Sequence, residues 1–337
     1  MKRVTLKDIA SHAGVSVALV SNYLNRHPSA RMSEQTREKI DRALKELDYH
    51  CSDIARSLRT GRSRIIGYFS ENLRNEVNQN EMMEIFDAAA EENYRVIVGF
   101  TGERKFSLDN IRSFLARGCD ALIVSGFFNQ QAAEQLAELH IPVVILNTHP
   151  TASCPGKMLR YDYRTAMRSA IQYLQQNGHT GIYYQAQNFT RNDQRAIEFL
   201  AHFPEDHVWN MKRSAGADDL RSFLKQHPDC TAMLHLNDYL AMRTIQNCTE
   251  LGLRIPEDIS IVGFDNIRAT EYSSPSLSSI RRPLSQAAHC AVRSVIAALD
   301  GVSEPLPEVL PCEFIPRNSV YYNKYVSTER NDDDESI

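Results

Sequence analysis

The chain has 337 residues, 42% of them hydrophobic and 24% charged, and this ordinary composition predicts a globular protein of two to three domains. It excludes collagen-like repeats and extended disorder. No run approaches the roughly 20 apolar residues of a membrane span, and the N-terminus lacks the apolar segment of a secretory signal. The seven cysteines are never closer than eighteen residues, which excludes a local CxxC metal or redox motif and fits a reducing cytoplasm.

Charge is unevenly distributed along the chain. The net charge is −4, but residues 1–64 carry +6 and the remainder carries −10. A small basic head on a large acidic body is typical of a protein whose head meets a polyanion such as nucleic acid. Chance clustering of surface lysines would give the same pattern, so charge alone does not establish that the head binds nucleic acid.

Three short helices are predicted within the first fifty residues. A capping-box pattern beginning at Thr5 opens a helix over Leu6–Ala13. Ser16 is the N-cap of a second helix that runs to Asn25, and Ser33 is the N-cap of a third. The turn between the first two helices is three residues long and contains a glycine, which is helix-turn-helix spacing.

The segment 50–61 is short, basic and poor in apolar residues, so it cannot bury a core of its own. Taken alone, it is an ordinary linker between the basic head and the acidic body.

From Arg64 onward, apolar runs alternate with helix-like segments. The predicted strands are Ile65–Ser70, Tyr94–Phe100, Ala121–Ser125, Pro142–Leu146, Gly181–Gln185, Val208–Lys212, Ala232–Leu236 and Ile259–Phe264. The predicted helices are Gln79–Glu92, Ser107–Arg117, Gln130–Leu139, Arg164–Gln176 and Tyr239–Leu251. This alternation predicts two doubly wound parallel sheets, with the Pro/Ser/Thr/Gly-rich stretch Asn147–Leu159 as the first crossover between them.

Residues that follow strands are the candidate ligand contacts, because ligands in open α/β sheets bind beyond the carboxyl ends of the strands. They are Glu71, Phe127, Asn147, Asn237 and Asp265. A purely structural interpretation competes with each: Asp265 could simply form a turn, and Asn237 could cap a helix.

The sequence contains no obvious catalytic motif. A GxG dinucleotide fingerprint, a GxxxxGK[ST] phosphate loop and a GxSxG nucleophile elbow are all missing, and no histidine has metal-ligand spacing. An enzyme is therefore the least favoured function class, and neither a cofactor nor a metal is expected.

The run from Val4 to Asn25 closely resembles the opening of lactose-repressor (LacI/GalR-type) transcription regulators. The resemblance continues through the head, the hinge and the body, at Ser33–Glu38, Leu47–Tyr49, Ala55–Gly61, Gly178-His179, Asn237-Asp238, Pro256–Asp265, Pro275–Leu277 and Arg317–Ser319. It implies an all-α helix-turn-helix head and an α/β periplasmic-binding-protein-like core of two doubly wound parallel-sheet lobes.

The resemblance also implies which head residues contact DNA. The second helix lies in the major groove, and Val17, Ala18 and Asn22 face base edges. Asn22 stands where the family usually has Arg, and Asn suits adenine whereas Arg suits guanine. The remaining head residues offer hydroxyls, amides or helix N-termini to phosphates: Thr5, Leu6, Ser16, Ser21, Asn25, Ser33 and Thr36.

In the family, the segment 50–61 becomes a helix on DNA, and an apolar residue from it enters the minor groove. By position that residue is Leu58, with Ala55, Arg56 and Arg59 beside it.

For the core, the resemblance implies a sugar-type ligand between the lobes, with Arg191, Arg195 and Arg282 joining the residues that follow strands. It implies a homodimer on near-palindromic double-stranded operator DNA, without a membrane partner. The implied domains are a head at 1–49, a hinge at 50–61, a first lobe at 62–160 and 284–311, a second lobe at 161–283 and 312–324, and an acidic disordered tail at 325–337.

The function expected from this organisation is a cytoplasmic transcriptional repressor controlled by a small molecule, a sugar or a sugar derivative. One alternative is a regulator of the same fold whose effector or partner protein strengthens DNA binding. A pure ligand-binding protein is the alternative from another class, and the DNA-binding head argues against it.

Overall fold

The computed structural model describes residues 4–24, 32–49, 61–70, 72–100, 108–126, 128–147, 152–154, 156–212 and 214–321. The chain divides into two compact units, Met1–Ser63 and Arg64–Ile337. Several predicted features lie outside the described residues: Asn25, Ala55, Arg56, Leu58, Arg59, Glu71, Phe127 and the tail 325–337.

The N-terminal unit contains α1 (Leu6–Ala13), α2 (Val17–Leu24) and α3 (Glu34–Glu46), as the sequence predicts. Thr5 and Asp8 form the expected capping box, and Gly14 ends α1 in the left-handed conformation at φ 68°, which favours glycine. The caps fix where each helix starts.

The small core of this unit holds α2 against the other two helices. Ile9, Val20 and Ile40, one from each helix, are fully buried at its centre. Two polar contacts add to this packing: His12 Nε2 lies 2.7 Å from Glu46 Oε2, and the hydroxyl of Tyr23 donates to Asp41 Oδ1 at 2.6 Å. Each ties α3 to one of the other helices.

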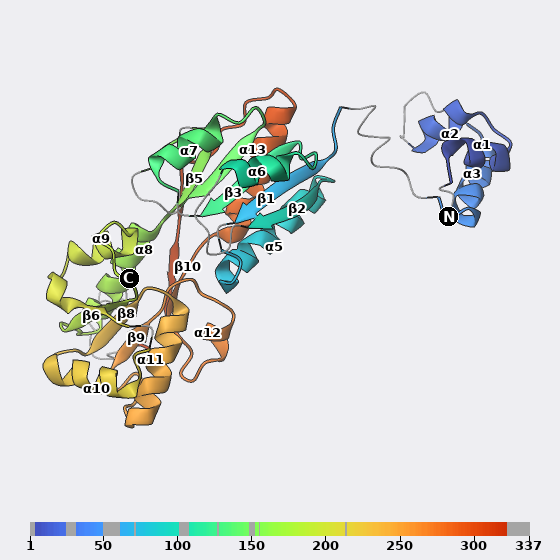
Figure 1. Cartoon of the computed structure of the whole chain (residues 1–337). Coiled ribbons are helices and arrows are strands. Elements are labelled where there is room, and N and C mark those ends of the chain that lie inside the picture. The colour runs from blue at the N-terminus through green and yellow to red at the C-terminus, as the bar shows by residue number, and fades with distance from the viewer. Residues whose placement is uncertain are drawn as a thin grey trace, which may run out of the picture. The chain divides into compact units, whose positions relative to one another are not determined.

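The second unit consists of two lobes, each built on a parallel sheet (Figure 1). The first lobe has the strand order β11-β5-β4-β3-β1-β2, and every pair in it is parallel. Its strands are β1 (Ile65–Ser70), β2 (Arg95–Phe100), β3 (Ala121–Gly126), β4 (Val143–Asn147), β5 (Met158–Asp162) and β11 (Val309–Pro311). Its helices are α5 (Glu76–Glu91), α6 (Leu108–Leu115), α7 (Gln130–Ala137) and α13 (Leu284–Leu299).

Alternate residues along the strands of the first sheet pack in two different cores. Leu122 and Val124 pack in one core with residues of α6 and α7, whereas Ala121 and Ile123 pack in the other with α5 and α13. Both faces are therefore covered by helices, which explains the nearly continuous apolar strands of this region.

The second lobe repeats this plan with the strand order β7-β6-β8-β9. Its strands are β6 (Ile182–Ala186), β7 (Val208–Asn210), β8 (Ala232–His235) and β9 (Ser260–Val262). Its helices are α8 (Tyr163–Gln176), α9 (Gln194–Leu200), α10 (Ala217–Gln226), α11 (Asp238–Leu251) and the short α12 (Ala269–Tyr272), with a 3₁₀ turn at Glu205–His207.

The chain passes between the lobes three times: after β5, after β10 (Ser279–Arg281) and after β11. β10 pairs antiparallel with β12 (Glu313–Ile315) as a two-stranded ribbon, and β10 is visible between the lobes in Figure 1.

One sequence prediction is corrected here. The predicted first crossover, Asn147–Leu159, includes the start of strand β5, which pairs with β4 in the first sheet and runs to Asp162, and the predicted lobe boundary at residue 160 falls within this strand. The five residues of β5 include Arg160 and follow a polar loop, so they do not resemble a buried strand. They form one because β4 and β11 supply backbone partners on both sides.

Candidate functional site

The start of α2 presents small, uncharged side chains to solvent. Val17 is 43% exposed, although it is apolar, and Ala18 is also exposed. Ser16 caps this end by accepting the Leu19 N–H at 3.2 Å, and Asn22 lies one turn further along, half-buried. A helix N-terminus with short side chains can approach base edges closely.

The hydroxyls predicted to meet phosphates already serve as caps. Thr5 Oγ1 donates to Asp8 Oδ2 at 2.7 Å, and Ser33 Oγ lies 2.9 Å from Thr36 Oγ1. Leu6 and Ser21 are half-buried on α1 and α2. The first turns that begin at these caps offer backbone N–H groups to an anion in addition to the side chains.

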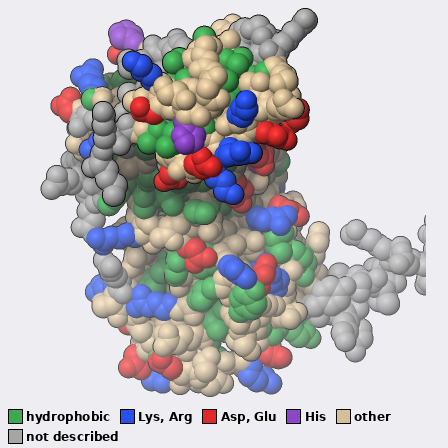
Figure 2. All heavy atoms as spheres, turned by 90° about the vertical axis from the view of Figure 1, so that its right-hand side faces the viewer, with side chains coloured by type: hydrophobic (Ala, Val, Ile, Leu, Met, Phe, Trp, Pro, Cys, Tyr) green, Lys and Arg blue, Asp and Glu red, His purple; other side chains and the backbone are tan. Residues whose placement is uncertain are grey.

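The basic excess of the head does not lie on its described helices. Residues 4–24 and 32–49 together carry a net charge of −1, whereas the rest of residues 1–64 carries +7. On the face of the whole chain in Figure 2, Lys and Arg side chains are interspersed with Asp and Glu. The positive charge is concentrated in the N-terminal residues, in the segment 25–31 and from residue 56 onward.

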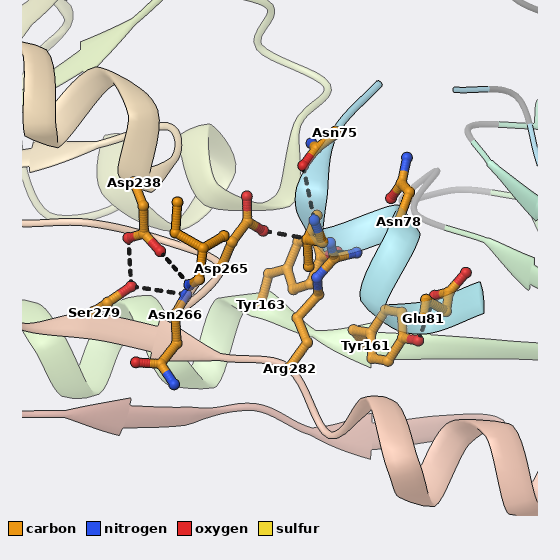
Figure 3. A network of polar contacts seen from close by, with 12 residues as sticks. Asn75, Asn78, Glu81, Tyr161, Tyr163, Asp238, Asp265, Asn266, Ser279 and Arg282 are labelled. Carbon is orange, nitrogen blue, oxygen red and sulfur yellow. Dashed lines mark hydrogen bonds and ion pairs between the residues drawn. The ribbon is translucent and has the colours of Figure 1, made fainter. Parts of the chain in front are cut away.

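In the core, Asp265 and Arg282 form a buried pair where the chain passes between the lobes (Figure 3). Their side chains are 8% and 6% exposed, and Arg282 Nη2 lies 3.4 Å from Asp265 Oδ1. Asp265 follows β9 at φ 109°, in a strained conformation, and its N–H donates to the Ile280 carbonyl at 2.9 Å. Burial raises the pKa of Asp265, against the opposing effect of Arg282 and Arg195.

The guanidinium of Arg282 is incompletely hydrogen-bonded. Nη1 donates to the Tyr163 hydroxyl at 3.3 Å, and the group lies 5.5 Å from the centre of the Tyr161 ring. Its Nε is buried and has no hydrogen-bond partner within the described ranges. A buried donor without an acceptor costs about 1–3 kcal/mol.

Arg195, in contrast, is held on several sides. It donates to both carboxylate oxygens of Asp193, at 2.8 and 2.6 Å, and to the Leu236 carbonyl at 2.6 Å. Its guanidinium carbon lies 4.9 Å from the centre of the Phe264 ring. Burial would raise the pKa of Asp193, but Arg195 outweighs it and the pKa lies below its ordinary value. These contacts hold the Arg195 side chain in place beside the Asp265–Arg282 pair.

Glu81 on α5 is a site residue that sequence reasoning missed. Its carboxylate is 1% exposed and accepts hydrogen bonds from the hydroxyls of Tyr68, at 2.9 Å, and Tyr161, at 2.7 Å. The available signal was a charged residue on the buried stripe of α5, between Val77 and Ile85 at four-residue spacing.

Asp238 is a second buried carboxyl beside the site. Oδ1 accepts the Ser279 hydroxyl at 2.6 Å and Oδ2 accepts the Ile267 N–H at 2.8 Å, which joins α11 to the segment after β9 and to β10. Burial raises the pKa of Asp238 to about 8, although the Ser279 hydrogen bond opposes this. Its neighbour Asn237 is an N-cap that accepts the Leu240 N–H at 3.0 Å.

The other predicted ligand contacts are not drawn into this network. Arg191 is 71% exposed and pairs with Glu205, and Asn147 is the last residue of β4.

Asp265 and Arg282 line a cavity of about 800 Å³, which lies between α5, the ribbon β10–β12 and the start of α13. This volume suits a small organic molecule.

In the described ranges, no cluster of three or more His, Cys, Asp or Glu side chains could hold a metal ion. No helix in the same ranges combines the length and apolar character that a membrane crossing requires.

Comparison with known proteins gives two family matches and full-length relatives. Residues 5–52 match the bacterial regulatory proteins of the lacI family, and residues 171–320 match the periplasmic binding protein-like domain. The chain is 30% identical to the transcriptional repressor PurR of Vibrio vulnificus, over 83% of this chain and 87% of PurR. It is 27% identical to the probable repressor ExuR of Bacillus subtilis, over 94% and 98% of the two chains.

Solved structures share the fold at lower identity. The Lac repressor dimer bound to operator and an anti-inducer aligns with a TM-score of 0.78 at 23% identity, over 94% of this chain and 99% of that one. A complex of the regulator CelR with cellobiose aligns with a TM-score of 0.65 at 21% identity, over 94% and 100%. With a helix-turn-helix head on a two-lobed core and a full-length relative at 30% identity, the chain belongs to the LacI family of bacterial regulatory proteins and is a DNA-binding transcriptional regulator.

Proposed function

We propose that this chain is a homodimeric repressor that acts on cytoplasmic DNA and is controlled by a small molecule bound between the lobes, without catalytic activity. The observation that carries the proposal is the buried Asp265–Arg282 pair beside a cavity of about 800 Å³. Asp265 follows a strand of the second lobe, whereas Arg282 lies where the chain returns to the first. A ligand that binds both residues would change the relative stability of two lobe arrangements.

The relatives support this proposal. PurR and ExuR are named repressors, and the Lac repressor structure is a dimer on its operator. We propose Val17, Ala18 and Asn22 as base contacts and Asp265 and Arg282 as ligand contacts, with Arg195 and Asn237 beside them. The segment 50–61 is proposed as the hinge that transmits the change to DNA.

Selection from a random DNA pool by the full chain tests the proposed binding of a dimer to operator DNA. We expect an enriched near-palindrome, because twofold symmetry of the protein requires it in the site. Asn22→Arg should shift one position per half-site toward guanine by about 1–3 kcal/mol. An enriched site without an inverted repeat would contradict the dimeric mode of binding.

The proposed control by a small molecule is tested by measuring operator affinity with and without small molecules. Asp265→Ala should bind the operator within about threefold of wild type but respond at least tenfold more weakly to the effector, because a charged hydrogen bond is lost. Asp258→Ala removes a carboxylate from the Arg254 ion pair and serves as the matched control. A folded Asp265→Ala protein with a normal response would remove Asp265 from the site. An effector that tightens operator binding would support the corepressor alternative.

A further inference from the structure

The start of α5 is fixed by side-chain hydrogen bonds. The N-cap, Asn75, accepts the Val77 N–H through its side-chain oxygen at 3.0 Å. Two more side chains of the helix donate back to carbonyls of the preceding loop, Asn78 to Asn72 at 2.6 Å and Gln79 to Leu73 at 2.8 Å. The first residue of the helix, Glu76, therefore has a well-defined position at the end of the first lobe.

Glu76 connects the first lobe to the second, away from the three crossovers. Its Oε2 accepts the Tyr239 hydroxyl and its Oε1 accepts the Arg268 N–H, both at 3.3 Å. These partners are 163 and 192 residues away in the sequence. Tyr239 lies in the first turn of α11, and Arg268 lies directly before α12. One carboxylate thus contacts two separate segments of the second lobe.

The two segments that Glu76 contacts are themselves joined. Asp238 Oδ2 accepts the Ile267 N–H at 2.8 Å, in the network drawn in Figure 3. Asp238 directly precedes Tyr239, and Ile267 directly precedes Arg268. Asp238 and Ile267 are both buried, so this hydrogen bond is protected from water. Glu76 therefore contacts one firmly connected part of the second lobe.

This part of the second lobe also carries proposed ligand contacts. Asn237 lies two residues before Tyr239, and Asp265 lies three residues before Arg268. A movement that takes Asp265 away from the first lobe therefore also takes Tyr239 and Arg268 away from Glu76. The Glu76 contacts and the ligand site depend on the same arrangement of the lobes.

The contacts of Glu76 are weak enough to break. Both are longer than the common ranges, which are about 2.7–3.2 Å for N–H···O and about 2.5–3.0 Å for O–H···O bonds. Tyr239 is 48% exposed and Arg268 is also exposed, so water competes for the same atoms. Contacts of this kind shift an equilibrium between two lobe arrangements by a small factor and do not lock either one.

We propose that Glu76 is a latch between the lobes, which holds the start of α11 and the segment after Asp265 against α5 and releases them when the lobes separate. This inference rests on the proposed function and assigns Glu76 as a positioning residue in its regulation. Because the latch favours one of two lobe arrangements, its loss changes the affinity for any partner, including operator DNA, that distinguishes them.

Hydrogen–deuterium exchange of the full-length protein tests the latch without a ligand. In Glu76→Ala, the Arg268 amide should exchange at least threefold faster, because its acceptor is removed. In Tyr239→Phe that acceptor remains, and the same amide should still exchange about twofold faster, because the two contacts open together. Unchanged exchange at Arg268 in either folded variant would overturn the latch.

Glu91→Ala is the matched control for both measurements. It removes a carboxylate of the same helix, but the partner of Glu91 is His289 of α13, at 3.1 Å within the first lobe. It therefore reproduces the loss of charge without the loss of a contact between lobes. Exchange at Arg268 and affinity for DNA should both stay within about 1.5-fold of wild type.

Affinity for the duplex enriched from the random pool tests the regulatory role. Glu76→Ala and Tyr239→Phe should each change this affinity about two- to fivefold in the same direction, which shows the lobe arrangement that the operator selects. The double variant should match Glu76→Ala, because Glu76→Ala already removes the contact with Tyr239. Additive effects of the two substitutions, or unchanged affinity in Glu76→Ala, would overturn the role of the latch.

Failure of this inference is distinguishable from failure of the proposed function. If no duplex is enriched, the proposed function fails, whereas exchange at Arg268 still decides whether Glu76 joins the lobes. If a duplex is bound and Glu76→Ala leaves its affinity unchanged, the regulator remains and the latch fails.

Discussion

The head and the core of this protein differ in the sequence distance over which their polar contacts act. In the head, His12 contacts Glu46, 34 residues apart. In the core, Glu81 meets Tyr161 across 80 residues, and Arg282 meets Tyr163 across 119. The head is thus built from local contacts, whereas the candidate ligand site needs the complete fold.

This difference has consequences for stability. A unit of about 60 residues buries a small core and is marginal on its own, so single core changes should unfold it. The larger unit spreads its stability over four buried clusters of described residues and tolerates more. Because the chain divides into two compact units, we expect two separate unfolding transitions.

Relative to the stability of the unit concerned, the largest expected effect is that of Ile40→Ala. Ile40 is fully buried at the centre of the head, and the truncation should cost about 2–5 kcal/mol, a large part of the stability of the unit. Calorimetry should show the head transition lowered or lost and the core transition unchanged, with operator binding abolished. A matching shift of the core transition would show that the two units do not unfold independently.

Glu81→Ala should lower the stability of the core and leave that of the head unchanged. It leaves the hydroxyls of Tyr68 and Tyr161 without their acceptor, at about 1–3 kcal/mol for each buried group. The core transition should fall while the head transition stays, and Glu81→Gln, which keeps an acceptor oxygen, should lose less. Equal melting of the Ala and Gln variants would mean that the buried hydrogen bonds contribute little.

The stability of the core should depend on pH. Because the pKa of Asp238 is raised from 3.8 to about 8 in the folded protein, folded Asp238 keeps its proton over a range where the unfolded chain releases it. Core stability therefore falls as pH rises from about 4 to 8, by about 1–3 kcal/mol. Asp238→Asn should remove this contribution, so the core stability of the variant relative to wild type should increase as pH rises. Parallel pH profiles of the core transition for the two proteins would contradict the assignment.

The smallest expected effect is that of Thr5→Ala, which removes the cap of α1. Loss of the hydroxyl that accepts the Asp8 N–H at 3.4 Å should cost about 1 kcal/mol in the head transition. Thr5→Ser retains the hydroxyl and should behave as wild type. An equal loss in Thr5→Ser would indicate that the threonine methyl group, rather than the cap, stabilises the helix.

The sequence by itself determined the head and the periodic parts of the core. The bounds of α1 were predicted to the residue, because Thr5 and Gly14 signal its ends through local backbone hydrogen bonding. The strand Ile65–Ser70 was likewise predicted to the residue, since a continuous apolar run bounded by polar residues is a local property.

Only the tertiary structure decided which residues form the candidate ligand site. β5, β10 and β12 are short and each contains a charged residue, and they become strands because distant segments supply their backbone partners. Glu81 and Tyr161 carry no local sign that they meet, and Arg195, predicted as a ligand contact, donates to Asp193 and to the Leu236 carbonyl. Burial, charge compensation and unfilled hydrogen-bonding capacity at Arg282 arise where three crossovers converge, so they depend on contacts that no local pattern encodes.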